Sequence, residues 1–339
     1  MKILVLQLKR IGDLILTTPA LYALRQHFPE AHITLAVEES CQDLLPGIPF
    51  VDQSLVFSRK KSNAKLWRKL ALASFDICLD FTGNDRTAFY SVLSKSKERV
   101  AFQWVQKSRF RALFYNRLVD SPVRNHHTID HYLDLLKGLG ITPEPVPITL
   151  EIPEWATKKA RQLLEAADIT GDFFAIHPGT ARIEKYWQPE RWAEVIEYCK
   201  RELNIPCVIT GGKEGFEQSQ IAAIKSKCQC ADLSGRVDLL TLAALAQRAK
   251  VVLSVDSAPM HLAAAFQTPQ VALFGPTNPF HWHPRHPKAV LVRAGHPQLG
   301  APLKPREQGA PMSEISTRKV IDAILAAYLH PDVQKETEA

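Results

Sequence analysis

Short apolar, β-rich runs alternate with helix-like patterns along most of this chain. In the first half the strand-like runs are 2–7, 32–37 and 76–81, and the helix-like segments are 18–28, 65–73 and 86–94. The second half repeats the pattern, with strand-like runs at 173–177, 207–210, 251–255 and 270–274 and helix-like segments at 154–167, 189–201, 217–224, 239–249, 259–266 and 317–329. Such βαβ alternation predicts an α/β protein with parallel sheets and two successive Rossmann-like domains.

A proline-rich segment separates the two halves. Residues 140–153 include four prolines and little helical periodicity, which is typical of a semi-rigid linker. With 339 residues, the chain is also longer than one compact core usually grows. We therefore expect domains at 1–150 and 151–339, with the ligand in the cleft between them at the carboxyl ends of the strands. The last helix closes the fold, and its packing back onto the first domain stays open.

Composition and charge exclude several classes of protein. The chain is 46% hydrophobic and 23% charged, which argues against a disordered protein. Its longest apolar runs fall far short of the ~20 residues that span a bilayer. The apolar run at 3–6 soon meets Lys9 and Arg10, so it is too short for a signal peptide, and we expect a cytoplasmic protein. The six cysteines include no CxxC pair and predict neither a disulfide framework nor a zinc site.

The loop after the first strand places Asp13 at a carboxyl strand end. We expect the next helix to begin at Thr18 and Pro19, because threonine caps helices and proline suits the first helical position. The loop has one glycine, so it lacks the GxGxxG fingerprint of a dinucleotide-binding enzyme. Asp13 is then either a turn residue or a catalytic carboxylate, and the sequence favours neither.

Two strand ends of the second half combine small residues with polar ones. His177 to Thr180 follow one strand, and Lys185 offers a flexible charge for phosphate, or else is a solvated loop residue. Gly211 and Gly212 follow the next strand, with Glu214 as an acceptor for a sugar or nucleoside hydroxyl. Small residues at such ends let a ligand approach the backbone closely.

The segment 251–261 predicts a buried strand that turns sharply into a helix. The amides at the start of that helix suit an anion such as a diphosphate. Asp256 should not face the phosphates, because like charges repel. It is expected either to cap the helix or to accept hydrogen bonds from sugar hydroxyls.

A basic stretch in the first half indicates an anionic partner. Residues 95–124 include eight Lys or Arg against two acids, a net charge of +6 in a chain of net charge +7. Phe102, Trp104, Phe110, Phe114 and Tyr115 are interleaved with these charges. Nucleic acid, phospholipid headgroups and phosphorylated or acidic sugars all fit such a patch.

Several short motifs, in order over nearly the whole chain, resemble glycosyltransferase family 9, the lipopolysaccharide heptosyltransferases and their relatives. They are Lys9 to Asp13, Thr17 to Leu21, His177 to Gly179 with Lys185 and Trp187, Gly211 and Gly212, Leu233 to Gly235, Asp256 to His261, and Leu273 to Thr277 with Pro279. The resemblance implies the GT-B architecture, in which two Rossmann-like domains face each other across a cleft. It implies acceptor binding by the first domain and nucleotide-sugar binding by the second.

The same resemblance implies an inverting, metal-independent transfer of heptose from ADP-heptose to the inner core of lipopolysaccharide. By position, Asp13 matches the general base, Lys185 the donor-phosphate lysine, and Thr180 and Glu214 further donor contacts. The donor loop is matched by Asp256, Ser257, Ala258, Pro259, Met260 and His261. No Asp-x-Asp pair is present to hold a metal against a diphosphate, so we expect no metal and no cofactor, with an ADP-sugar as co-substrate.

The basic segment is then assigned to the acceptor. We expect Lys107, Arg109 and Arg111 to bind the anionic lipopolysaccharide core, with peripheral contact to the inner membrane surface and no nucleic-acid partner. Two alternatives stay open at this point. One is a nucleotide-sugar epimerase of the same architecture, and the other is a nucleic-acid-binding protein that uses residues 95–124.

Overall fold

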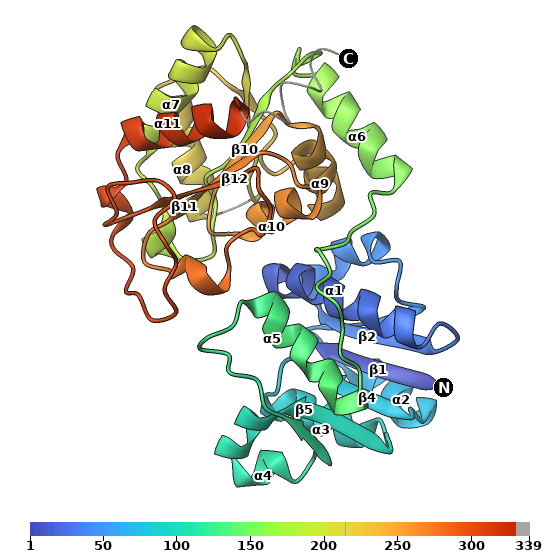
Figure 1. The fold of residues 1–339 in the computed structure, drawn as a ribbon. Helices are drawn as coiled ribbons and strands as arrows, with labels where there is room; N and C mark the ends of the chain where they lie inside the picture. The colour runs from blue at the N-terminus through green and yellow to red at the C-terminus, as the bar shows by residue number, and fades with distance from the viewer. Residues whose placement is uncertain (214, 330–339) are drawn as a thin grey trace. The chain divides into compact units, whose positions relative to one another are not determined.

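The computed structural model describes residues 1–213 and 215–329. The chain divides into two compact units, Met1–Glu151 and Ile152–Ala339, each an α/β unit built on its own parallel sheet (Figure 1). The expected α/β fold is thus confirmed. Among the described residues, no helix combines the length and the apolar character needed to cross a bilayer.

The first unit has a six-stranded parallel sheet in the order β3-β2-β1-β4-β5-β6. Its strands are β1 (Lys2–Gln7), β2 (His32–Glu38), β3 (Gln53–Phe57), β4 (Ile77–Asp80), β5 (Glu98–Phe102) and β6 (Arg117–Val119). Its helices are α1 (Ile11–His27), α2 (Ala64–Ala73), α3 (Asp85–Leu93), α4 (Arg109–Ala112) and α5 (Thr128–Asp134), with 3-10 helices η1 (Glu39–Gly47), η2 (Gln103–Lys107) and η3 (Leu135–Leu139).

Two pairs of helices cover the sheet of the first unit. Helix α1 packs against α5, and α2 packs against α3. Because crossovers between parallel strands are right-handed, these two pairs lie on opposite faces of the sheet (Figure 1). The central strand β1 is buried on both faces, and its register sets Leu6 beside Asp80 of β4. The ends of β1 and β4 therefore lie next to each other.

Helix α1 begins earlier than expected. It starts at Ile11, so Thr18 is not its cap and Pro19 lies inside the helix. Proline cannot donate to the carbonyl of Ile15, but the Thr18 hydroxyl donates to that oxygen at 2.9 Å. The side chain of Thr18 thus replaces the missing backbone bond, and the helix passes through the proline.

The basic segment 95–124 is partly sheet. It contains β5 and β6, neither of which was expected. Of its interleaved aromatic residues, Phe102 and Tyr115 are buried and Trp104 and Phe114 are half-buried, while Phe110 is exposed. Most of these rings therefore pack in the core, and they do not form a stacking platform on the surface.

The second unit has a six-stranded parallel sheet in the order β12-β11-β10-β7-β8-β9. Its strands are β7 (Phe174–His177), β8 (Cys207–Ile209), β9 (Ala231–Asp232), β10 (Val251–Val255), β11 (Gln270–Phe274) and β12 (Ala289–Arg293). Its helices are α6 (Glu154–Glu165), α7 (Pro189–Glu202), α8 (Phe216–Lys225), α9 (Leu239–Arg248), α10 (Ala258–Ala265) and α11 (Thr317–Tyr328), with 3-10 helices η4 (Ile183–Lys185), η5 (Pro279–His281) and η6 (Met312–Glu314).

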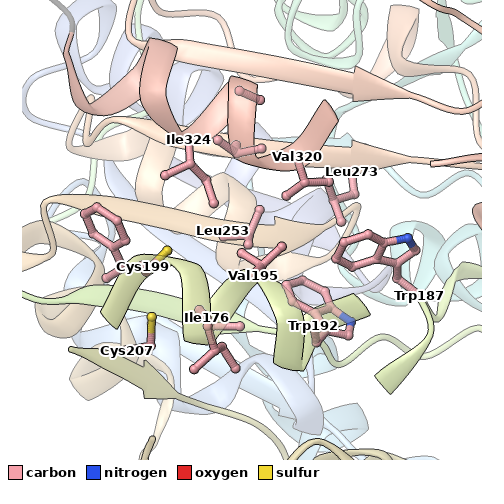
Figure 2. Close-up of a cluster of buried hydrophobic side chains, with 14 of the residues drawn as sticks. Ile176, Trp187, Trp192, Val195, Cys199, Cys207, Leu253, Leu273, Val320 and Ile324 are labelled. Atoms are coloured by element: carbon pink, nitrogen blue, oxygen red, sulfur yellow. The ribbon is translucent and has the colours of Figure 1, made fainter. Parts of the chain in front are cut away.

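The main core of the second unit lies between its sheet and helices α7, α8 and α11. Trp187 and Trp192 meet there edge to face at 5.2 Å, against Leu253 and Leu273 of the sheet (Figure 2). Helix α11 buries Val320 and Ile324 in this core. The sequence left open a return of the last helix onto the first domain, but its apolar face is buried in the second unit.

Candidate active site

Asp13 lies in the first turn of α1, directly after the carboxyl end of the central strand β1. The hydroxyl of Tyr132, on α5, donates a hydrogen bond of 2.6 Å to Oδ1 of Asp13. The backbone oxygen of Asp13 accepts from the Thr17 hydroxyl at 2.7 Å. Its carboxylate is half-buried, so it is both held in place and open to a substrate. The sequence had also allowed a plain turn, but Asp13 is helical.

Lys9 contacts the same tyrosine that bonds to Asp13. Its Nζ lies 3.3 Å from the Tyr132 hydroxyl and 5.1 Å from the centre of that ring. Burial lowers the pKa of Lys9, while the charges of Asp13 and Asp80 oppose that shift. Lys9 is therefore the positive charge that balances the carboxylates at the ends of β1 and β4.

Asp80, at the end of β4, is fully buried and has a structural role. Its Oδ1 accepts from the amides of Thr82 and Gly83 at 2.8 Å each, and Tyr115 donates to Oδ2. Burial raises the pKa of Asp80, although these hydrogen bonds favour its charged form. Because its oxygens are occupied and out of solvent, Asp80 fixes the turn after β4 and leaves Asp13 as the accessible carboxylate.

Helix α5 holds Tyr132 rigidly. The ring of Tyr132 meets Phe81 edge to face at 5.7 Å, and the neighbouring His131 stacks on Phe102 at 3.9 Å. Burial lowers the pKa of His131 to about 3, so this imidazole is neutral at physiological pH. Sequence reasoning missed Tyr132, because 119 residues separate it from Asp13 and no local pattern marks it.

In the second unit, Lys185 and Asp256 form a buried ion pair. Nζ of Lys185 lies 2.6 Å from Oδ2 of Asp256, and their side chains are only 12% and 10% exposed. Lys185 ends η4, and Asp256 follows β10. The sequence had assigned Lys185 to a phosphate or to a solvated loop, and the loop assignment is wrong. A lysine has three donors, so Lys185 can bind an anion while keeping Asp256.

The start of α10 has no side-chain cap. The sequence suggested Asp256 as a cap for this helix or as an acceptor for sugar hydroxyls. Asp256 does not cap the helix, because its carboxylate pairs with Lys185. Ser257 stands at the cap position, but its hydroxyl donates to the carbonyl of Val255 at 3.3 Å. The first amides of α10 thus keep their capacity to bind an anion, beside the ammonium of Lys185.

The other predicted donor-loop residues differ in exposure. Ser257 and Ala258 are half-buried at the start of α10. Pro259, Met260 and His261 are buried, and Met260 packs against Ala272 and Phe274. These three residues pack inside the unit, and Ser257 and Ala258 are the more exposed residues of the predicted donor loop.

Glu217 is the carboxylate at the ends of β7 and β8. Its Oε1 accepts from the amide of Gly212 at 2.8 Å, and a Cβ on Gly179 would lie only 1.9 Å from that oxygen. Glycine at 179 and 211 thus makes room for this side chain. The predicted Glu214 lies outside the described residues. A glycine pair followed by an acid in the next helix's first turn is the signal that could have identified Glu217.

His177 completes this corner as a neutral group. Its Nδ1 lies 2.9 Å from the Thr210 hydroxyl, and its Nε2 lies 3.7 Å from Oε1 of Glu217. Burial lowers the pKa of His177 to about 4, and burial raises the pKa of Glu217. Nearby, the half-buried Thr180 accepts from the amide of Arg182 at 3.4 Å.

The predicted acceptor residues lie after the carboxyl end of β5, in the first unit. Lys107 and Arg109 are exposed at the end of η2 and the start of α4. Arg111 is tied down by Asp85 at 2.8 Å and by the carbonyl of Gly83 at 3.2 Å. Of these three residues, Lys107 and Arg109 are therefore the more exposed ones.

A cavity of about 720 Å³ opens beside the charged groups of the second unit. Its lining is mainly apolar and includes Tyr186, Phe216, Pro276 and Met312, but none of Lys185, Glu217 and Asp256. Over residues 1–213 and 215–329, no cluster of three His, Cys, Asp or Glu side chains is placed to hold a metal ion.

Comparisons with known proteins identify the family of this chain. The family model described as glycosyltransferase family 9 (heptosyltransferase) matches residues 63–307. Lipopolysaccharide heptosyltransferase 3 of Escherichia coli is 26% identical over 84% of this chain and 86% of its own length. These matches fit the motif order that the sequence showed.

Two solved structures share the fold. A glycosyl transferase of family 9 from Veillonella parvula superposes with a TM-score of 0.82 at 26% identity, covering 97% of each chain. E. coli heptosyltransferase WaaC with ADP-2-deoxy-2-fluoro heptose gives 0.72 at 20% identity, covering 96% of this chain and 99% of that one. Because the family model covers most of the chain, the alternatives of an epimerase and a nucleic-acid-binding protein fall away. This chain belongs to glycosyltransferase family 9 and is a glycosyltransferase.

Proposed function

We propose that this enzyme transfers heptose from ADP-heptose to the inner core of lipopolysaccharide, with inversion at the anomeric carbon and without a metal. The observation that carries the proposal is the half-buried Asp13, held at the end of β1 by Tyr132. The relative from E. coli is a lipopolysaccharide heptosyltransferase, and the WaaC structure holds an ADP-heptose analogue. These relatives support the choice of donor and acceptor.

Asp13 acts as the general base in this mechanism. It accepts the proton of an acceptor hydroxyl while that oxygen bonds to the anomeric carbon, and the bond from that carbon to the ADP oxygen breaks. A single displacement of this kind inverts the configuration. Tyr132 orients the carboxylate, and Nζ of Lys9 lies 3.3 Å from the same Tyr132 hydroxyl. General-base help contributes about 10²–10⁴-fold to the rate.

Lys185 and the start of α10 stabilise the departing diphosphate. The ammonium of Lys185 and the uncapped amides beside Ser257 supply positive charge where negative charge develops. Asp256 keeps the ammonium in position. Glu217 is an acceptor suited to hydroxyls of the nucleotide or sugar. Thr180 remains a proposed donor contact. Glu214 stays a proposed donor contact without a structural account.

Lys107 and Arg109 are proposed to bind the phosphates and acidic sugars of the acceptor. Both are exposed, and Arg111 holds their segment against Asp85. Because such an acceptor is anchored in a lipid layer, we place the reaction at the inner face of the cytoplasmic membrane.

Metal independence rests on the chemistry of the residues. The sequence contains no Asp-x-Asp pair, and Lys185 provides a cation for the leaving group. No cofactor beyond the ADP-sugar is required by this mechanism. Turnover is expected to be unchanged in EDTA. Loss of transfer on chelation, with recovery on adding magnesium or manganese, would make the metal-free mechanism wrong.

The donor is tested by thermal stabilisation with ADP-, UDP- and GDP-sugars. A ligand at about 100 times its Kd stabilises the native state by about 2.7 kcal/mol, so the true donor class should stand out. Transfer is then followed with ADP-heptose and a lipopolysaccharide core acceptor, with the anomeric configuration of the product read by NMR. A new sugar epimer formed without any acceptor would contradict the proposal.

A further inference from the structure

Exposed apolar side chains gather on helices α2, α3 and α4 of the first unit. Leu72, Phe110 and Leu113 are 71%, 69% and 77% exposed, and Trp67 and Phe89 are 46% and 49% exposed. Together with the exposed Val92 they form what we call the α2–α4 surface. Among the described residues, thirteen large hydrophobic side chains are exposed, and six of them lie here. Such a concentration indicates an interaction surface and not random exposure.

Side-chain contacts link the three helices to one another. Helix α2 packs on α3, and across that contact the rings of Trp67 and Phe89 meet edge to face at 6.1 Å. Indole Nε1 of Trp67 donates to the hydroxyl of the buried Tyr90 at 3.4 Å. The Arg111–Asp85 pair ties α4 to the start of α3. These contacts therefore hold the helices that carry the exposed apolar side chains in place.

The charge of this surface is strongly positive. Helices α2, α3 and α4 carry six basic residues and a single acid, Asp85, which is paired with Arg111. Lys65, Arg68 and Lys69 are exposed beside Leu72 and Trp67. Aromatic and leucine side chains surrounded by Lys and Arg are the pattern of a segment that lies in the interface of an anionic bilayer.

We propose that the α2–α4 surface docks this enzyme onto an anionic lipid bilayer. A second copy of the chain is a poor occupant, because a two-fold contact would set this positive surface against itself. A nucleic acid would use the basic groups but would leave Leu72 and Leu113 in water. A bilayer takes up both kinds of side chain, with the rings at headgroup level and the aliphatic groups below.

This inference rests on the proposed function for its purpose, since a lipid-anchored acceptor calls for an enzyme at a membrane. Its test does not require transfer. Wild-type protein and the triple variant Trp67→Ser, Leu72→Ser, Phe89→Ser are sedimented with vesicles of phosphatidylcholine, with or without phosphatidylglycerol. The control is Trp155→Ser on α6, since Trp155 is 49% exposed in the second unit.

Wild type and the Trp155→Ser control should bind the anionic vesicles, and bind neutral ones weakly. The triple variant should lose at least about tenfold in affinity, because the apolar area that enters the interface is gone. Equal binding by the triple variant, or an equal loss in the control, would overturn the proposal. So would self-association of the wild type that the triple variant abolishes, or preferential binding of an oligonucleotide.

A second variant keeps the test open if the triple variant fails to fold. Lipids brominated in their acyl chains quench tryptophans that enter the bilayer. Quenching should fall in Trp67→Phe and stay at the wild-type level in Trp155→Phe, and the opposite pattern would refute docking through α2 and α3. Transfer to a water-soluble, deacylated acceptor should be unchanged in the triple variant. If neither the wild type nor any variant transfers sugar, the proposed function is wrong. Vesicle binding still tests whether the α2–α4 surface docks onto a bilayer.

Discussion

The strand ends of the two units differ in what surrounds the functional groups. In the first unit, Tyr132 on the distant helix α5 donates a hydrogen bond to the carboxylate of Asp13. In the second unit, two glycines make room for the Glu217 carboxylate, and the helix start next to Asp256 has no side-chain cap. Rigid support of one carboxylate suits proton transfer, whereas open backbone suits the binding of a polar ligand.

The two units also use a lysine in different ways. Burial lowers the pKa of Lys9, whereas the charges of two acids, Asp13 and Asp80, raise it. Lys185 instead makes one tight contact with Asp256 and can turn its other donors to a ligand.

The largest effect is expected from Asp13→Asn. Asparagine keeps the shape of the side chain and can accept from Tyr132, but it cannot take up a proton at neutral pH. Turnover should fall by about 100-fold or more, while the melting temperature and the affinity for ADP-sugar stay close to wild type. Turnover close to the wild-type rate would show that Asp13 has no catalytic role. The melting temperature is measured beside the rate, since lost stability would itself lower activity.

Lys185→Ala should weaken donor use by about 1.5–3 kcal/mol, because a charge-assisted contact to phosphate is lost. It should also destabilise the second unit, because Asp256 is left buried without its cation. The matched control is the double variant Lys185→Ala, Asp256→Asn, which should recover stability without recovering the donor KM. Unchanged donor KM and turnover in Lys185→Ala would confine the pair to a structural role.

His177 should make the fold sensitive to acid. Its pKa is lowered to about 4 by burial, so the unfolded chain binds a proton at that residue before the folded one does. The free energy of unfolding therefore falls as the pH drops from about 6.5 towards 4. The raised pKa of Glu217 acts in the opposite direction.

His177→Gln should flatten this acid dependence, as measured by urea unfolding at neutral pH and at about pH 5. His131→Phe provides the matching test in the first unit, where burial lowers the pKa of His131 to about 3. An unchanged pH dependence in His177→Gln would mean that other groups cause the acid sensitivity of the second unit.

Gly179→Ala should raise the donor KM by about tenfold or less, because the new Cβ displaces the Glu217 carboxylate from the strand ends. Little stability should be lost, since the displaced atoms end a flexible side chain. Gly171→Ala serves as the control, because a Cβ there meets nothing within 4 Å. An unaltered donor KM would show that Glu217 makes no contact with the donor.

The smallest effect is expected from Lys107→Ser with Arg109→Ser. The acceptor KM should rise a few-fold and depend less on salt, because screened surface charges steer an anionic partner. Lys158→Ser, at an exposed site on α6, is the control. A defect confined to the donor KM would contradict the assignment of these residues to the acceptor.

Sequence patterns predicted much of the fold but not the contacts inside the sites. The run after Met1 is a central buried strand, as its composition indicated, and Asp13 follows its end. Thr18 and Pro19 misled the prediction of the helix start, because local capping preference was outweighed by burial of this face of α1. The strands β5 and β6 were not predicted, because charged residues lie within and around them.

The sequence by itself determined the α/β fold, the family, and the chain positions of Asp13, Lys185 and Asp256. These follow from local periodicity and short motifs, which are readable along the chain. Only the tertiary structure decided that Tyr132 holds Asp13, that Lys185 pairs with Asp256, and that Glu217 fills the space left by glycines. Such partners are 119 and 71 residues apart in the first two cases. Packing of helices on a sheet creates those contacts, and no local pattern encodes which distant side chains will meet.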